Sequence, residues 1–327
     1  MDEKGEIKIL KDVNLPKEFI NSDGNEYVFE YIDCKEKLFL SLFFESLLDN
    51  SSLDLENYIA LLFKTYSKNN SKIQQLLGQI ESMQNIPIEI LSKYFVRLYS
   101  CESEFNNYIN KDLRLGKMEK YLPYIKTLYQ GLELNSLPLL SGKCILYRSS
   151  IISLDEFNKI TNYLKKKIER SNCKFVFAKP FLSFSKDRKV AEEYLRMEKI
   201  NTNFIKVFFI LDIDMDINSN YCLNTHCDLE SISFYQIEKE VLFFPFSAFE
   251  IKEIREISIN NVRCYQINLL YLGKYLINNL KDEMTIPDSE FKMELFKSWL
   301  IEKDSVGKPN FLFEKYKEYK EGLKSKK

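Results

Sequence analysis

The chain has 327 residues, enough for about two domains, and the composition of a folded globular protein. Apolar residues make up 45% of the sequence and aromatic residues 14%, which excludes global disorder. Lys plus Arg number 47 and Asp plus Glu number 48, so the formal net charge of −1 excludes an overall basic nucleic-acid binder.

The first ten residues are acidic and lack the basic and apolar regions of a secretory signal. The most apolar stretches, Leu38–Leu48 and Phe204–Leu211, are each interrupted by a charge and are too short to cross a bilayer. The 7 cysteines are scattered without a C-x-x-C pair, which predicts reduced thiols. These features predict a soluble cytoplasmic protein without a membrane span, with export as an effector by a route that needs no signal peptide as the alternative.

The first part of the chain is predicted to be mainly helical. Two short strands, Glu6–Leu10 and Glu26–Ile32, are expected near its start. From about residue 35 to residue 134, apolar residues recur at helical spacing, as in the segment Ile90–Ser100. The segment Asn135–Gly142, which contains a proline, is expected to connect this helical part to the rest of the chain.

After residue 142, short runs of Phe, Ile and Val alternate with amphipathic segments. Strands are predicted at Lys143–Arg148, Lys174–Ala178, Phe181–Ser185, Phe204–Ile213, Ser231–Tyr235, Glu240–Ile251 and Val262–Leu272. Helices are predicted over Asp187–Met197 and from Ser153 to about Arg170, where Ser153 and Glu156 form a capping box. Because long strands follow one another without regular helices between them, we predict an α+β fold with mostly antiparallel strands.

The histidine content gives little support for a histidine-based or metal-based mechanism. His226 is the chain's one histidine and is expected to lie in a loop. Cys222, His226 and Cys227 lie within six residues, without a second ligand pair elsewhere, so they would make a poor tetrahedral zinc site. We therefore expect no metal.

Arg148 and a Ser-x-Ser motif are the first polar features with a defined chemistry. Arg148 ends a predicted strand, where its guanidinium could hold a phosphate through two hydrogen bonds or simply face solvent. Ser183 and Ser185 are two residues apart in a predicted strand, so their hydroxyls share one face and Phe184 points to the other. These hydroxyls could brace other polar groups, or Ser185 could cap the helix that follows.

Glu238 and Glu240 form the next motif, directly before the apolar run Val241–Phe246. As residues i and i+2 of a strand, they are expected to share a face. Two like charges held close together raise the pKa of at least one carboxyl, a pattern typical of functional sites. The alternative is a hydrated turn between strands.

The order and spacing of these three motifs resemble the mono-ADP-ribosyltransferase family of the Arg-Ser-Glu type. Ser183 follows Arg148 by about 35 residues, and the glutamates follow about 55 residues later. The surrounding residues are also similar, namely Tyr147-Arg148, Phe181–Ser185, Glu238–Phe243 and a helical lead-in, Leu98–Arg114. The resemblance covers residues 95–272 and implies two packed sheets around an NAD cleft, preceded by helices.

The resemblance also implies roles for the polar residues, with NAD as substrate and no metal. Arg148 would hold the pyrophosphate or the adjacent ribose, next to Ser149, where many relatives have glycine. Ser183 would brace the site through hydrogen bonds, including one to the catalytic glutamate. Ser185 would make a secondary contact to the nucleotide site or serve as a helix cap.

For the two glutamates, the resemblance implies a division of labour. Glu240 would be the catalytic glutamate, bonded to a hydroxyl of the nicotinamide ribose, and Glu238 would orient the acceptor. In this family a glutamate at the position of Glu238 goes with arginine acceptors, so the implied partner is a protein substrate with an exposed arginine. An NAD glycohydrolase, with water as acceptor, and a non-catalytic interaction module with a vestigial cleft are the alternatives.

Aromatic residues near the motifs have open roles. Tyr194 is a candidate for stacking on nicotinamide, but core packing explains it equally well. Phe234 and Tyr235 come just before the glutamates and could contact the acceptor or anchor the turn.

Three regions follow from these observations. Residues 1–92 form a mostly helical region without an assigned role. As the resemblance implies, residues 93–284 would form the ADP-ribosyltransferase domain, with a helical lead-in at 93–140 and a β core at 141–284. Residues 285–327 form a helical, Lys-rich C-terminal tail, with helices predicted at 271–281 and 288–302.

Overall fold

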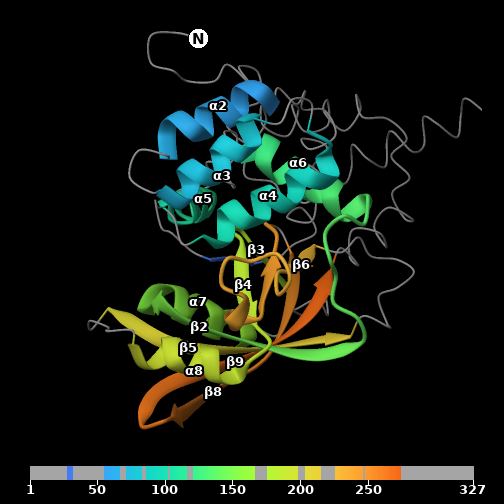
Figure 1. Ribbon diagram of the computed structural model, residues 1–327. Coiled ribbons are helices and arrows are strands. Elements are labelled where there is room, and N and C mark those ends of the chain that lie inside the picture. Colours follow the sequence, from blue (N-terminus) through green and yellow to red (C-terminus); the bar gives the residue numbers. More distant parts are fainter. Residues whose placement is uncertain are drawn as a thin grey trace, which may run out of the picture.

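The computed structural model describes residues 28–31, 55–66, 71–82, 86–101, 104–115, 121–165, 175–197, 203–214, 225–245 and 247–273. In this part of the chain, a layer of helices lies against one end of a mixed β-sheet (Figure 1). The predicted α+β class is confirmed. The strand predicted at Glu6–Leu10 and the helix predicted at 288–302 lie outside the described residues. The helix predicted at 271–281 is wrong at its start, since residues 271–273 end strand β9 (Val262–Gly273), and its remainder lies outside the described residues.

The helical layer contains α2 (Leu55–Tyr66), α3 (Ser71–Ser82), α4 (Ile88–Ser100), α5 (Glu104–Arg114) and α6 (Leu122–Glu133). These helices confirm the helical period predicted over this stretch. In α4, Leu91, Phe95 and Leu98 recur at helical spacing and are buried. The boundary predicted between residues 1–92 and residues 93–284 falls inside α4, so this helix belongs to both predicted regions.

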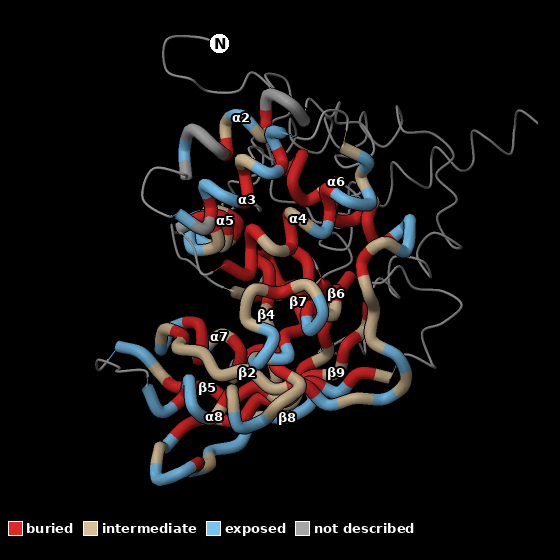
Figure 2. The backbone as a smooth tube through the Cα atoms, viewed as in Figure 1, coloured by how far each residue is buried: buried red, intermediate tan, exposed pale blue. Residues whose placement is uncertain are grey.

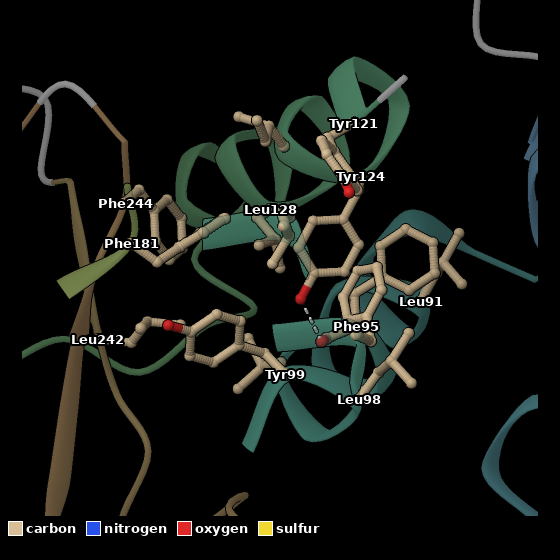
Figure 3. Packing of buried hydrophobic residues seen from close by; sticks show 14 of the residues in the cluster. Leu91, Phe95, Leu98, Tyr99, Tyr121, Tyr124, Leu128, Phe181, Leu242 and Phe244 are labelled. Carbon is tan, nitrogen blue, oxygen red and sulfur yellow. Dashed lines mark hydrogen bonds between the residues drawn. The ribbon is translucent and has the colours of Figure 1, made fainter. Parts of the chain in front are cut away.

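The core of the helical layer continues into the sheet. Phe95 stacks on Tyr124 with ring centroids 4.8 Å apart, and the Tyr124 hydroxyl donates a 2.6 Å hydrogen bond to the Phe95 carbonyl oxygen (Figure 3). Phe181 and Phe244 reach this cluster from the sheet. Helices and sheet therefore share one hydrophobic core at this end, which fixes the start of the Ser-x-Ser strand against α4.

The sheet has the strand order β1-β3-β8-β9-β5-β2-β4-β7-β6. Its strands are β1 (Phe29–Tyr31), β2 (Lys143–Ser153), β3 (Phe175–Ala178), β4 (Leu182–Ser185), β5 (Phe204–Asp214), β6 (His226–Asp228), β7 (Glu240–Phe243), β8 (Ala248–Ile259) and β9 (Val262–Gly273). Among these pairs only β5 and β9 run parallel, which confirms the predicted mostly antiparallel sheet.

The two packed layers expected from the sequence are made by one folded sheet. A single residue pair, Tyr147 with Ser185, joins β2 to β4 and links the two halves of the ladder. Across the fold, Phe243 of β7 lies 5.5 Å from Phe249 of β8 and 5.1 Å from Tyr271 of β9, between ring centroids. The apolar faces of the two halves therefore pack together in one buried cluster. Figure 2 colours the buried residues of the chain red.

Two helices lie against the β core, α7 (Leu154–Lys165) and α8 (Arg188–Met197). The Glu156 amide donates a 3.1 Å hydrogen bond to Ser153 Oγ, which confirms one half of the predicted capping box. The Glu156 carboxylate turns away and accepts hydrogen bonds from the amides of Val28 and Phe29 at 2.7 and 3.4 Å. It thereby attaches the edge strand β1 to α7.

Three predictions around the second half of the sheet need correction. The predicted strand Ser231–Tyr235 is a series of turns. The predicted strand Glu240–Ile251 is two strands, β7 and β8, separated at Pro245, because proline has no N–H for a ladder bond. His226, expected in a loop, is fully buried in β6.

Candidate active site

All six site residues predicted from the sequence line one cavity. The cavity of about 240 Å³ is bordered by β2, β4, α8 and the turn before β7. Its lining residues are Tyr147, Arg148, Ser149, Ser183, Phe184, Ser185, Val190, Ala191, Tyr194, Glu238 and Glu240. One cation, two carboxylates and three serines thus surround a space open to a ligand.

Arg148 is held in this cavity by the neighbouring strand. Its Nη1 donates a 2.7 Å hydrogen bond to the backbone oxygen of Ser183. The two residues come close because β2 and β4 pair at Tyr147 and Ser185, one position away from Arg148. This strand contact fixes the position of the guanidinium at the cavity.

Ser183 and Glu240 are joined by a short hydrogen bond in the cavity. Ser183 Oγ donates a 2.5 Å hydrogen bond to Glu240 Oε1. In the β4–β7 ladder Ser183 pairs with Leu242 and Ser185 pairs with Glu240, so this bond runs diagonally across the two strands. Phe184, between the serines, is buried against Phe243 in the sheet core, which confirms the predicted division of faces.

Glu238 and Glu240 meet in the cavity for a different reason from the one predicted. They do not belong to one strand, since Glu238 ends a 3-10 helix (Gln236–Glu238) and Glu240 begins β7. Between them Lys239 has φ 47° and ψ 47°, a left-handed conformation that costs free energy for a non-glycine residue. This local reversal of the chain brings both glutamates to the cavity.

Hydrogen bonds from β4 and the segment after it hold this strained turn. Ser185 Oγ donates to the Glu238 carbonyl oxygen at 2.6 Å, and the Lys186 amide donates to the Lys239 carbonyl oxygen at 3.0 Å. Ser185 therefore holds the turn and is not the cap of the following helix. The cap of α8 is Asp187, whose Oδ1 accepts a 3.0 Å hydrogen bond from the Lys189 amide.

A cluster of charges that the sequence did not point to supports the same turn. Lys186 Nζ bonds Asp228 Oδ2 at 2.8 Å and Glu230 Oε2 at 2.5 Å. Despite partial burial, these two carboxylates raise the pKa of Lys186. The Leu229 amide, between the two acids, donates to the Glu240 carbonyl oxygen at 2.8 Å, so the cluster lies beside the backbone of Glu240.

The aromatic residues near the glutamates divide into an anchor and a cavity residue. Phe234 packs against the helical core, and Arg97 of α4 lies over its ring at 4.8 Å, so Phe234 anchors the turn. Tyr194 is 43% exposed, so it is not a core residue, which was one of its two predicted roles. Its hydroxyl donates a 2.7 Å hydrogen bond to Glu238 Oε1, a contact that no sequence spacing indicates.

Helices α4 and α5 contact the chain at the start of β4, next to the cavity. Tyr99 of α4 is buried, and Asn110 of α5 donates a 2.8 Å hydrogen bond to its hydroxyl oxygen. The same asparagine accepts a 3.1 Å hydrogen bond from the Phe181 amide, at the entrance to β4. Burial, and to a smaller extent the negative charge of Glu240, raises the pKa of Tyr99 above its usual range, so this phenol stays neutral.

The described part of the chain contains no candidate metal centre and no candidate membrane span. No group of three or more His, Cys, Asp or Glu side chains in this part of the chain could hold a metal ion. None of its helices has both the length and the apolar character needed to cross a membrane.

Comparisons with known proteins identify similar folds but no sequence match. No protein-family model matches the chain, and no curated protein matches it in sequence. Among solved structures, Vis from Vibrio splendidus, an ADP-ribosyltransferase in complex with agmatine, is 16% identical with a TM-score of 0.33, over 70% of this chain and 90% of Vis. HopU1 from Pseudomonas syringae, also an ADP-ribosyltransferase, is 13% identical with a TM-score of 0.40, over 65% of this chain and 87% of HopU1.

A third similar structure is Plx2a, an ADP-ribosyltransferase toxin from Paenibacillus larvae. It is 14% identical with a TM-score of 0.37, over 66% of this chain and 96% of Plx2a. All three are ADP-ribosyltransferases, the family that the sequence motifs resemble. At these identities and TM-scores the functional assignment rests on the residues of the cavity.

Proposed function

We propose that this protein is an NAD-dependent mono-ADP-ribosyltransferase that transfers ADP-ribose to a protein arginine and releases nicotinamide. The observation that carries the proposal is the 2.5 Å hydrogen bond from Ser183 to Glu240, in a cavity that also contains Glu238 and Arg148. The sequence resemblance predicts these residues for these roles, and the strand pairing provides the reason for their proximity.

Glu240 is assigned to the bond that breaks. As the bond between the nicotinamide nitrogen and ribose C1′ opens, the electron pair leaves with nicotinamide and positive charge develops on the sugar. A fixed carboxylate beside that charge lowers the barrier electrostatically, as paired carboxylates do in glycosidases. The Ser183 hydroxyl fixes one oxygen of Glu240, which leaves the carboxylate little reorganisation to make during the reaction.

Glu238 is assigned to the acceptor. A guanidinium has a pKa above about 12 and is a poor nucleophile until it is held in line and loses a proton. A second carboxylate can do both: it pairs with the guanidinium and accepts its proton as the nitrogen–C1′ bond forms. An arginine acceptor therefore calls for two acids in one cavity, and Glu238 is the second.

Arg148 is assigned to the phosphates of NAD, with Ser149 beside it on β2 and Ser185 supporting the turn. The Ser183 carbonyl oxygen fixes the Arg148 guanidinium at the cavity, and guanidinium groups suit phosphate oxygens. The cavity of about 240 Å³ lies below the roughly 300–1,000 Å³ of typical ligand sites. We therefore assign this cavity to the reacting end of NAD and not to the whole dinucleotide.

Acceptor choice is tested with NAD labelled in its adenylate part, given together with polyarginine or polylysine. The proposal predicts label on polyarginine and none on polylysine, because only the planar guanidinium offers two parallel N–H groups that one carboxylate can orient. Equal labelling of both polymers would contradict an arginine acceptor. Nicotinamide release without labelling of either would favour an NAD glycohydrolase.

A further inference from the structure

We propose that Tyr194 is a positioning residue for the acceptor: its hydroxyl fixes the Glu238 carboxylate and so favours a guanidinium over water. This inference rests on the proposed function, because it assigns a partner to the acceptor glutamate. It starts from the 2.7 Å hydrogen bond between Tyr194 Oη and Glu238 Oε1, which joins residues 44 positions apart.

The direction of the Tyr194 side chain is set by the packing of α8. Ala191 and Leu195, on either side of it, are 3% and 1% exposed and attach this helix to the sheet. The buried Lys206 side chain of β5 donates a 2.6 Å hydrogen bond to the Leu195 carbonyl oxygen near the helix end. With α8 fixed in this way, Tyr194 faces the cavity, which it helps to line.

The backbone of Glu238 is fixed as well, so its side chain is the part that needs a partner. Ser185 Oγ donates a 2.6 Å hydrogen bond to the Glu238 carbonyl oxygen, and the Glu238 amide donates a 3.0 Å hydrogen bond to the Tyr235 carbonyl oxygen. The carboxylate itself is partly exposed, and a glutamate in water moves among several rotamers. A phenol donor on Oε1 selects one of these and presents Oε2 to the acceptor.

The contact matters for transfer more than for hydrolysis. Water needs no in-line orientation by Glu238, whereas a guanidinium must be aligned with C1′ by this carboxylate before it reacts. Removal of the Tyr194 hydroxyl therefore weakens binding of the acceptor and spares the cleavage of NAD at Glu240. The sequence also made Tyr194 a candidate for stacking on nicotinamide. That role would depend on the aromatic ring and not on the hydroxyl.

The test is a double-mutant cycle with Tyr194→Phe, Glu238→Ala and the double variant, assayed by nicotinamide release over a range of agmatine concentrations. Tyr265→Phe serves as the matched control, because this tyrosine packs on Phe157 in the sheet core. We expect Tyr194→Phe to lower kcat/KM for agmatine about tenfold, mainly through a higher KM. Agmatine-independent release should stay within about twofold, as in the control.

In the Glu238→Ala background, the same substitution should have no further effect on transfer, because its partner is gone. An equal loss in both backgrounds, an equal loss of hydrolysis, or an unchanged kcat/KM for agmatine would each overturn the inference while the proposed function stands. Absence of agmatine-stimulated release from the wild-type protein would overturn both.

Discussion

Ser183 and Glu240 lie diagonally across the β4–β7 ladder, and the serine hydroxyl bonds the carboxylate at 2.5 Å. Glu240 is 7% exposed, so its carboxylate needs such a donor to offset the loss of hydration on burial. The arrangement depends on strand register: a shift of either strand by one residue would turn its own side chain away from the cavity.

Substitution of Ser183 by Ala should reduce nicotinamide release about 10- to 100-fold, since a hydrogen bond to a charged group contributes about 1.5–3 kcal/mol. The protein should fold, because the backbone pairing of β4 does not involve this hydroxyl. Ser258→Ala, on the exposed part of β8, is the matched control. Wild-type turnover in Ser183→Ala would show that the bond has no part in catalysis.

Substitution of Glu238 by Ala should separate the two reactions of the site. Transfer to agmatine should fall by at least about 100-fold with loss of the orienting base, while hydrolysis of NAD stays within a few fold. Nicotinamide release is measured with and without agmatine, and Glu253→Ala, an exposed glutamate of β8, serves as control. Should Glu238→Ala transfer to agmatine at the wild-type rate, the role assigned to Glu238 is wrong.

Acid should destabilise the protein through His226. Its Nε2 accepts a 3.3 Å hydrogen bond from the Leu140 amide, and burial lowers its pKa from 6.5 to about 4. The unfolded chain therefore binds a proton that the folded chain does not, so stability is lost as the pH falls from about 6.5 to about 4.

His226→Gln keeps an acceptor for Leu140 and removes this titration. Between pH 7 and pH 4, the wild type should lose about 3 kcal/mol more unfolding free energy than the variant, at about 1.4 kcal/mol per pKa unit. The measurement is urea denaturation at constant ionic strength. Parallel pH profiles of the two proteins would show that His226 titrates normally in the fold.

Glu156 should have the opposite pH dependence. Burial raises its pKa from 4.5 to about 7, against the hydrogen bonds from the Val28 and Phe29 amides. The folded chain then holds a proton that the unfolded chain has released, so the stability present below about pH 4.5 is lost as the pH rises through about 7.

Glu156→Gln keeps an oxygen for both amides and cannot ionise. Between pH 4.5 and pH 8 the wild type should therefore lose about 3 kcal/mol more unfolding free energy than this variant, because only the wild-type side chain ionises. Asp155→Asn, the exposed neighbour at the start of α7, should follow the wild-type profile. A Glu156→Gln profile that also follows the wild type would contradict the assignment.

The sequence predicted side-chain directions correctly within a single regular strand. The period of two in β4 predicted that both serines face the cavity and that Phe184 is buried. It failed where the backbone leaves regular structure: the left-handed Lys239 places Glu238 in a turn and not in the strand. The contact of Tyr194 with that glutamate follows from the packing of α8, which no local spacing encodes.

For the fold, too, regular elements were predicted and features that depend on tertiary contacts were not. Apolar periodicity predicted the helices and most strands, but the alternation over Ser231–Tyr235 is not that of a strand. Ile232 and Phe234 there pack against the helical core, so tertiary contacts explain their apolar character. The link between the two halves of the sheet rests on the single pair Tyr147–Ser185, a feature with no sequence signal.

The central claim is tested most directly by nicotinamide release from NAD, with and without agmatine, for the wild type and Glu240→Gln. The amide keeps the size of the side chain and removes the charge that stabilises the developing cation, which should cost at least about 100-fold. The account predicts release that rises with agmatine in the wild type and is lost in the folded variant. Agmatine-stimulated release at equal rates from both proteins would contradict it.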